Sequence, residues 1–298
     1  MAAEHVAQQA AEHAAGNERI GEVIIHHISN GEVIVPIRIP IGSYTLDLSI
    51  TKAVLLLWIV AAVVFVLFTW LAQRLKKSED GAPKGTLTTM LEFFVSAIRE
   101  QVVLPFIGAK YTPTFLPLIL TFFVFILMAN LLGLTPIVDA IGALGAQFHI
   151  PGVEKLAHGS STATGNFNVT AGLALVTFFA IIYAGSVAHG FVTHWVNLVP
   201  HGLPWWVYII LIPVELMGMF VKPFALTMRL AANMTAGHAA ILAIMSFIFV
   251  FQTWLMGFVS VPLMTGLMLL EIIVCFVQAY VFTLLSALFI GMAIHVHH

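Results

Sequence analysis

Five windows of this chain contain no Asp, Glu, Lys or Arg, and each is long enough to cross a membrane as a helix. They cover 53–73, 111–138, 156–214, 230–270 and 272–298. A helix needs about 20 mainly apolar residues to span the hydrocarbon core of a bilayer. Only 9% of the 298 residues are charged, against about 25% in soluble domains. The sequence therefore predicts an all-α integral membrane protein with five membrane helices and no large soluble domain.

Charges outside these windows set the order and orientation of the helices. We predict an extracytoplasmic N-terminal segment over 1–49 and a membrane domain over 50–298. The membrane domain divides into a membrane helix over 50–74, a surface helix over 86–105, membrane helices over 114–137 and 169–192, and long helices over 205–251 and 254–295. Four basic residues between 74 and 84 make the first loop cytoplasmic by the positive-inside rule. Alternation then puts the N-terminus outside and the C-terminus in the cytoplasm.

The last two helices are too long to stand upright in a bilayer. An unbroken helix over 205–251 would reach about 70 Å, more than twice the roughly 30 Å of the hydrocarbon core. The helix over 254–295 poses the same problem. We therefore expect the two to be strongly tilted and to form a hairpin joined near Gln252.

The segment over 86–105 is amphipathic. Its apolar face carries Leu87, Leu91, Phe94, Ile98 and Val102, and its polar face carries Glu92, Ser96, Arg99 and Glu100. A helix of this kind lies on the membrane surface rather than crossing it. Pro105 is expected to close the helix.

The N-terminal segment has its own signals. Asn30-Gly31 lies between two runs rich in Val and Ile, a pattern that predicts a small β-hairpin. Residues 1–49 carry six acids and only two bases, Arg19 and Arg38, which favours the extracytoplasmic side.

Composition excludes several classes of ligand. The net charge of -2 gives no footprint for a nucleic acid, so no nucleic-acid partner is expected. The single cysteine, Cys275, excludes a multi-cysteine metal site, and the histidines lack metal-binding spacing, so neither a metal nor another cofactor is expected. The N-terminus lacks a signal-peptide run and is too acidic for an organellar transit peptide, which makes a bacterial cell (inner) membrane the expected location.

Arg229 lies in the apolar sequence ALTMRLAANMTAGH, and no Asp, Glu, Lys or Arg occurs between Arg229 and Glu271. An arginine near the bilayer centre costs between about 2.5 and 17 kcal/mol, so it needs a carboxylate or a wet cavity. Only four acids follow residue 110, and two of them belong to the predicted outer loop around 137–168. The candidate partners are therefore Glu215, Glu271 or an acid on another protein.

Polar residues form one stripe on each long helix. The first stripe consists of Glu215, Lys222, Arg229 and Asn233, and the second of Ser260, Glu271 and Gln278. Their separations return close to the same helical face. Two polar stripes on neighbouring membrane helices suggest a hydrated path, along which Glu215 and Lys222 can pair only loosely.

His238 and Glu271 place an imidazole and a carboxylate in apolar helices. Both groups serve proton relays because either can titrate in a suitable environment. A single membrane histidine is more often a hydrogen-bonded packing residue, and an Arg-Glu pair can be purely structural. Five polar or charged side chains, each costly to place within a membrane, together favour a functional role. They are Arg229, Asn233, His238, Glu271 and Gln278.

The chain from Thr86 to its C-terminus closely resembles subunit a of the F-type ATP synthase, bacterial type. The resemblance is carried by FVKPFALTMRLAANMTAGH and LLEIIVCFVQAYVFTLLSALFI, and before them by FVFILMANLLGLTPI and NFNVTAGLAL. Its most specific part is the Arg-x-x-x-Asn motif with a Gln in the last helix.

The resemblance implies a proton-conducting stator in the Fo sector, with no catalytic site of its own. Arg229 would face the carboxylates of a rotating ring of c subunits and block proton leak between two offset half-channels. The outer half-channel would contain Asn233, His238, Glu271 and Gln278, with Asn166 near its mouth, and Glu215 would belong to the cytoplasmic one. Further implied partners are the b-subunit peripheral stalk, membrane lipid and, indirectly, the F1 head.

Two positions depart from the best-known bacterial pattern, which has an acid at His238 and a histidine at Glu271. The exchange keeps one acid and one imidazole, so a relay remains possible. Asn166 stands where some members have an acid. Four small residues beside the stripe would allow close approach of the ring or packing within this chain; they are Ala231, Ala232, Ala236 and Gly237.

Two other classes of protein use intramembrane polar groups. An ion-coupled secondary transporter would show two related halves with corresponding broken helices, and no such repeat occurs here. A membrane-embedded enzyme would need convergent ligands at helical spacing, which the sequence lacks.

Overall fold

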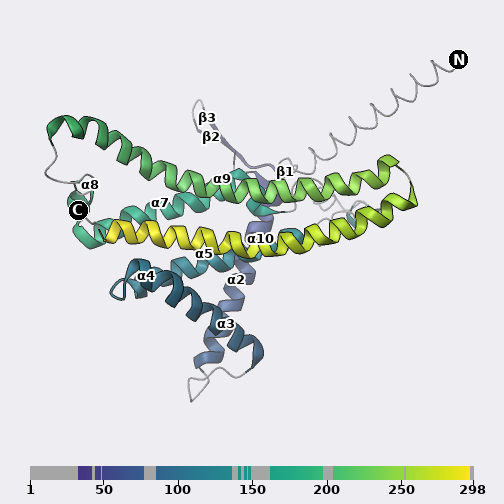
Figure 1. Ribbon diagram of the computed structural model, residues 1–298, viewed down its shortest axis with the longest axis horizontal. Helices are drawn as coiled ribbons and strands as arrows, with labels where there is room; N and C mark the ends of the chain where they lie inside the picture. Colours follow the sequence, from purple (N-terminus) through teal and green to yellow (C-terminus); the bar gives the residue numbers. More distant parts are fainter. Residues whose placement is uncertain are drawn as a thin grey trace. The chain divides into compact units, whose positions relative to one another are not determined.

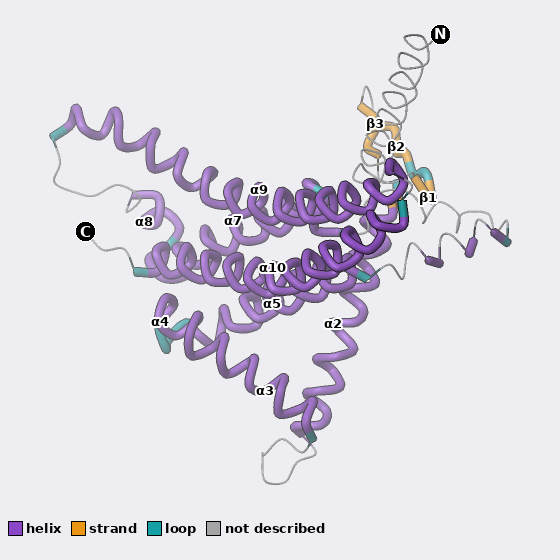
Figure 2. Tube along the Cα trace, turned by 45° about the vertical axis from the view of Figure 1, so that its right-hand side comes forward, coloured by secondary structure: helices purple, strands orange, loops and turns teal. Residues whose placement is uncertain are grey.

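The computed structural model describes residues 33–41, 44–47, 49–76, 85–135, 140–141, 144–145, 147–148, 162–196, 204–251 and 253–295. Figure 1 labels the elements along the chain, and Figure 2 shows that most of the described chain is helical.

Five helices of the described chain are long and apolar enough to cross a membrane. They are α2 (Lys52–Lys76), α5 (Thr112–Leu134), α7 (Phe167–His189), α9 (Trp205–Phe251) and α10 (Trp254–Ile294). Their mean hydropathy ranges from 1.9 to 2.8 over the spanning stretches. The prediction of a mainly helical fold with five membrane-capable helices is confirmed.

Helical backbone continues past Pro105, where the sequence predicted an end. The segment consists of α3 (Thr86–Ile98), a π-helical turn η1 (Arg99–Val103) and α4 (Leu104–Ile107). Pro105 lies in the first turn of α4, where its missing N–H costs little. The segment ends instead at Gly108, whose φ of 82° suits glycine.

The third membrane-capable helix, α7, ends three residues earlier than the predicted limit of 192. Gly190 follows it with a φ of 90°, which interrupts the helix before α8 (Phe191–Val196).

Four short strands precede α2. Strand β2 (Arg38–Ile41) pairs antiparallel with β3 (Tyr44–Asp47), with Ile41 opposite Tyr44, and β1 (Val33–Val35) pairs with β4 (Ile50–Thr51). Proline cannot donate to a strand ladder, and Pro36 lies between β1 and β2. The hairpin predicted around Asn30-Gly31 lies partly outside the described residues and stays a prediction.

The chain forms two compact units. Unit 1 comprises Met1–Trp58, Ala129–Asn166 and Ala232–Cys275, and unit 2 comprises Ile59–Met128, Phe167–Ala231 and Phe276–His298. The unit boundaries fall inside α2, α5, α9 and α10, so each of these helices contributes residues to both units.

Unit 2 contains the larger apolar core. Its fully buried side chains come from several elements and include Val102 of η1, Ile107 of α4, Ile119 and Ile126 of α5, Leu230 of α9 and Ile290 of α10. Phe122 and Phe282 meet edge to face with ring centroids 5.5 Å apart. Gly291 allows close backbone contact with α4, because a Cβ there would overlap the carbonyl of Phe106.

Two histidines fix the C-terminal end of α10 within unit 2. The Nε2 atom of His189 lies 2.9 Å from the carbonyl oxygen of Ile294, and Nε2 of His295 lies 3.2 Å from that of Ile107. A carbonyl can only accept, so both imidazoles donate. Ile294 and Ile107 end α10 and α4, where backbone carbonyls lack partners within the helix.

Candidate functional site

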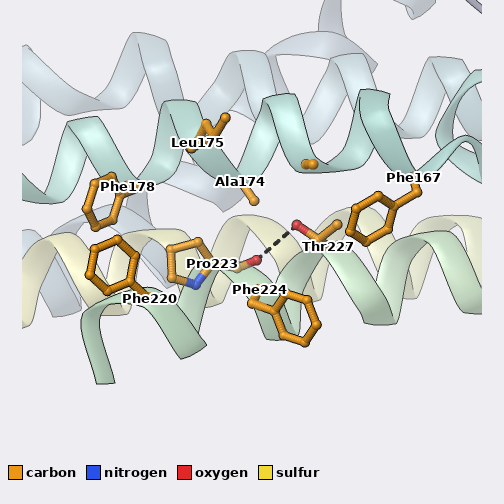
Figure 3. A pocket seen from close by; sticks show the side chains of 9 residues that line it. Phe167, Ala174, Leu175, Phe178, Phe220, Pro223, Phe224 and Thr227 are labelled. Atoms are coloured by element: carbon orange, nitrogen blue, oxygen red, sulfur yellow. Dashed lines mark hydrogen bonds between the residues drawn. The ribbon is translucent and has the colours of Figure 1, made fainter. Parts of the chain in front are cut away.

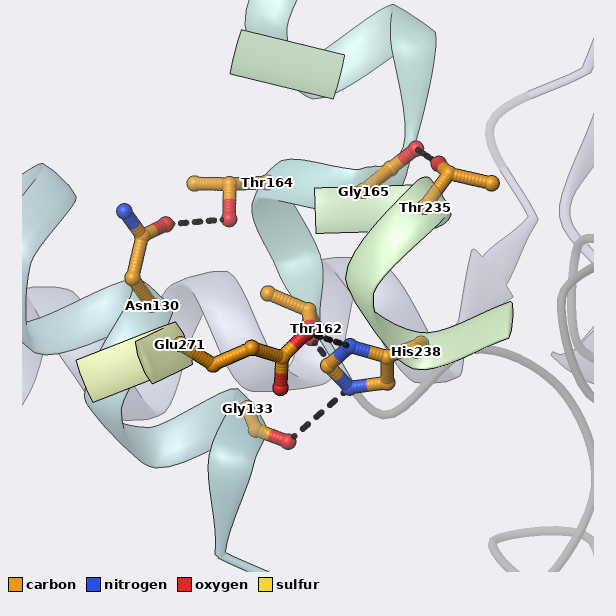
Figure 4. A network of polar contacts seen from close by, with 8 residues as sticks. All are labelled: Asn130, Gly133, Thr162, Thr164, Gly165, Thr235, His238 and Glu271. Carbon is orange, nitrogen blue, oxygen red and sulfur yellow. Dashed lines mark hydrogen bonds and ion pairs between the residues drawn. The ribbon is translucent and has the colours of Figure 1, made fainter. Parts of the chain in front are cut away.

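Unit 1 contains a polar cluster built from four segments. Figure 4 shows its members, which come from the end of α5, from the turn at 162–165, from α9 and from α10. They are Asn130, Gly133, Thr162, Thr164, Gly165, Thr235, His238 and Glu271. Polar groups inside apolar helices require partners of this kind, because no water is present in the hydrocarbon core to satisfy them.

Glu271 and His238 are the two ionisable members of the cluster. The carboxylate is 5% exposed, and its Oε1 atom lies 3.9 Å from Nδ1 of His238. The preceding residue on α9, Gly237, provides the space for the carboxylate, since a Cβ there would overlap Oε1. The structure thus brings the predicted acid and imidazole together.

The other nitrogen of the imidazole has two oxygen neighbours. Nε2 of His238 lies 2.9 Å from the hydroxyl oxygen of Thr162 and 3.3 Å from the carbonyl oxygen of Gly133. A Cβ on Gly133 would overlap the Thr162 side chain, so glycine is needed for both groups to reach the ring.

Two further hydrogen bonds connect the 162–165 turn to the helices. Thr164 donates to Oδ1 of Asn130 on α5 over 2.6 Å. Thr235 of α9 donates to the carbonyl of Gly165 over 3.5 Å. The turn therefore lies against both α5 and α9.

Three buried polar atoms of the cluster have no hydrogen-bond partner among the described residues. They are Nδ2 of Asn130, Nδ1 of His238 and Oε2 of Glu271. Buried polar groups are usually satisfied by protein or by ordered water. The cluster thus combines two titratable groups with unused hydrogen-bonding capacity.

The polar stripe residue Ser260 and the remaining predicted residues of the outer path have different positions. Ser260 and Gln278 lie on the same face of α10 as Glu271 and are 4% and 3% exposed, as the spacing predicted. Asn166 follows the 163–165 turn and is half-buried, while Asn233 on α9 is exposed. Gln278 belongs to unit 2 and the other three to unit 1.

Arg229 and Glu215 both belong to unit 2 and lie on α9. Arg229 is exposed and Glu215 is half-buried. Fourteen residues separate them, which is about 21 Å along a helix, so Glu215 cannot be the partner of Arg229. The Lys222 ammonium lies 5.7 Å from the ring centre of Phe289 in the same unit, and its loose pairing with Glu215 stays a prediction.

The four small residues that the sequence placed beside the polar stripe of α9 divide into two pairs. Ala231 is 9% exposed and Gly237 is half-buried against Glu271, so both pack within the chain. Ala232 and Ala236 are exposed, as is Arg229.

The sequence did not indicate Asn130, Gly133, Thr162 or Thr164 as site residues. They lie more than 70 residues before His238, and neither their type nor their spacing predicts contact with it. The only available signal was the concentration of hydroxyl and small residues in GSSTATGN, just before the third membrane helix.

Unit 2 contains an apolar cavity, whose lining differs from the polar cluster of unit 1. Figure 3 shows this cavity of about 270 Å³ between α7 and α9. It is lined by Phe167, Ala171, Ala174, Leu175, Phe178, Phe220, Pro223, Phe224 and Thr227. Its one hydroxyl, on Thr227, bonds the carbonyl of Pro223 over 3.1 Å. None of the lining side chains is ionisable. In the described part of the chain, no three His, Cys, Asp or Glu side chains converge as metal ligands.

Replacing Gly237 with alanine is expected to destabilise the protein by about 1–3 kcal/mol, because the added methyl group overpacks the site at Glu271. Gly218→Ala is the matched control: it lies on the same helix, and a Cβ there meets nothing within 4 Å. An alanine at that position should be neutral or stabilising by up to about 1 kcal/mol. Thermal unfolding of the purified protein measures both, and equal midpoints would contradict the close contact at Gly237.

Five membrane-capable helices with a buried carboxylate beside a half-buried imidazole define a multi-pass membrane protein with an ionisable site inside its spanning segments. Residues 54–291 match the profile of a family described as ATP synthase A chain. The chain therefore belongs to the ATP synthase A chain family.

Three relatives illustrate the similarity. The chain is 42% identical to ATP synthase subunit a 2 of Prosthecochloris aestuarii, over 98% of its own length and 85% of that protein. It is 41% identical to ATP synthase subunit a of Chloroherpeton thalassium, over 91% of this chain and 76% of that protein. It is 38% identical to ATP synthase subunit a of Anaeromyxobacter dehalogenans, over 100% of this chain and 76% of that protein. These matches do not favour the secondary-transporter alternative.

Proposed function

We propose that the chain is the proton-conducting stator subunit of the Fo sector of an F-type ATP synthase. Two offset half-channels deliver protons to and from the carboxylates of a rotating c-ring, and this flow is coupled to ATP synthesis. The observation that carries the proposal is the pairing of the buried Glu271 with the half-buried His238 within membrane-capable helices of an ATP synthase A chain family member.

The outer half-channel is lined by Asn233, His238, Glu271 and Gln278, with Asn166 near its mouth. Four of these residues belong to unit 1, which supports a shared path. The three unpartnered polar atoms of the cluster offer hydrogen-bonding sites to water, and water is what a proton path requires. Glu215, half-buried in unit 2, serves the cytoplasmic half-channel.

Arg229 is the partner of the ring carboxylates and the barrier to leak. Its exposure on α9 supports this role, since the acid that stabilises it would be on another protein. The exposed Ala232 and Ala236 on the same helix allow a ring helix to approach closely.

The two long helices cross the membrane at a strong tilt. With 47 and 41 residues, α9 and α10 exceed what an upright crossing needs. A tilted helix can follow the curved surface of a ring over several subunits. The segment over 86–105 lies on the membrane surface, where Arg99 and Glu100 are exposed.

The assembly and its orientation complete the proposal. The chain lies in a bacterial cell (inner) membrane with its N-terminus outside and its C-terminus in the cytoplasm. It contacts the c-ring, the b-subunit peripheral stalk and membrane lipid, and it acts on the F1 head only indirectly. It needs no cofactor.

The proposal is tested by reconstituting the complete complex into liposomes and measuring proton flux driven by a potassium diffusion potential. A complex assembled without this chain should conduct no more than empty liposomes while still hydrolysing ATP. Undiminished flux without the chain would overturn the proposal, and flux that requires a cotransported solute would favour a secondary transporter.

A further inference from the structure

His238 has two ring nitrogens with different surroundings. Nδ1 faces the Glu271 carboxylate, and Nε2 faces Thr162 and Gly133 (Figure 4). The atoms that surround each nitrogen determine which of them holds a hydrogen in the neutral ring.

The Gly133 carbonyl fixes the assignment at Nε2. A carbonyl oxygen can only accept a hydrogen bond, so its approach to 3.3 Å requires a hydrogen on Nε2. The Thr162 hydroxyl, at 2.9 Å, can rotate to accept from the same N–H. The opposite arrangement, with a bare Nε2, would set the nitrogen lone pair against the carbonyl oxygen.

Helix α5 strengthens this preference. The helix ends at Leu134, so the Gly133 carbonyl belongs to the last turn, where carbonyls have no partner within the helix. The partial negative charge at a helix C-terminus also favours a donor and a cationic ring. The His238 N–H therefore gives this helix-end carbonyl a donor from the described part of the chain.

We infer that Thr162 and Gly133 are positioning residues that keep a hydrogen on Nε2, so that His238 exchanges protons only through Nδ1. The inference rests on the proposed proton-conducting function. Because a single nitrogen exchanges, a proton cannot enter the ring at one edge and leave at the other. His238 therefore does not pass protons through; it holds one proton in common with Glu271.

The proton balance of the pair follows directly. In one state Glu271 is protonated and His238 is neutral; in the other the carboxylate is ionised and Nδ1 carries the proton. The transfer breaks one O–H bond, forms one N–H bond and leaves the total charge unchanged. Closing the 3.9 Å separation by about 1 Å brings Oε1 and Nδ1 to hydrogen-bond distance. Oε2 of Glu271 has no partner among the described residues. The proton that Oε1 receives moves on after the carboxyl group rotates and turns this O–H away from the ring. The O–H bond then breaks, the proton passes to a water molecule, and the carboxylate is left ionised.

The test is nitrogen NMR of the complete complex with ¹⁵N-labelled histidine, in which the His238 signals are identified by their loss in His238→Gln. The neutral ring should carry its hydrogen on Nε2. Thr162→Val removes one acceptor and should raise the Nδ1–H form about five- to tenfold, the effect of losing one hydrogen bond. Thr162→Ser should restore the native spectrum. Thr265→Val is the matched control, since that hydroxyl bonds the carbonyl of Val261 on its own helix.

Proton pumping is measured on the same samples and should fall in Thr162→Val and recover in Thr162→Ser. A native neutral ring with its hydrogen on Nδ1 would overturn the inference, even if Thr162→Val failed to assemble. An unchanged spectrum and unchanged pumping in Thr162→Val would also overturn it. Either result leaves the proposed function intact as long as flux depends on the chain, so the two failures are distinguishable.

Discussion

Arg229→Ala is expected to abolish ATP-driven proton pumping while the complex still assembles. A nearby guanidinium favours the ionised form of a carboxylate by about tenfold to a thousandfold. Without it, a ring carboxylate that passes the stator would keep its proton, and the ring would lose its coupling to proton release. We expect pumping to fall at least about tenfold on this ground, with passive proton leak unchanged or raised.

Inverted membrane vesicles that carry the complete complex allow acidification and leak to be recorded in the same preparation. Lys222→Ala is the matched control, because it removes another base from α9 whose ammonium lies over the Phe289 ring. It should affect pumping much less than Arg229→Ala. Normal pumping by Arg229→Ala would contradict the role of Arg229 as partner of the ring carboxylates and would make it a structural charge.

Glu271→Gln should reduce pumping by at least about 100-fold, the usual minimum effect of a positioned proton-transfer group. Glutamine keeps the size and one oxygen of the side chain, but it cannot release a proton. Its neighbours His238 and Gly237 would keep their contacts, so assembly should be preserved.

ATP-driven acidification, normalised to ATP hydrolysis by the same vesicles, measures this loss. Glu271→Asp should retain part of the activity, because a carboxylate remains in the cluster. Thr283→Ala changes another buried polar residue of α10, whose hydroxyl bonds the carbonyl of Ala279 on the same helix, and should pump normally. Equal pumping by Glu271→Gln and the native chain would remove Glu271 from the path.

The sequence predicted the features that depend on local pattern. Windows without charge predicted the five membrane-capable helices, because an apolar stretch of that length has few alternatives to a helix in a bilayer. Helical spacing predicted that Ser260, Glu271 and Gln278 share one face, and all three are buried. The helix over 86–105 was less predictable, because the π-helical turn at Arg99–Val103 depends on how the segment packs.

Contacts between distant segments could not be predicted. Thr162 and Gly133 reach His238 only because the turn before α7 and the end of α5 lie beside α9. Nothing in their own spacing marks them, since threonine and glycine are common in membrane helices for packing reasons alone. The intramembrane partner of Arg229 could not be predicted from this sequence either, because the family resemblance implies an acid on another protein.

The two histidine contacts at the end of α10 have a mechanical consequence. His189 of α7 bonds the carbonyl of Ile294, the last residue of α10, and His295, the next residue, bonds the carbonyl of Ile107 at the end of α4. Sliding α10 along its axis by one residue, about 1.5 Å, would break both hydrogen bonds at once. In the proposed role as a stator, the chain would bear tangential force from the rotating ring. The two hydrogen bonds would then oppose displacement of α10 along its axis, because they connect its C-terminal end to α7 and α4.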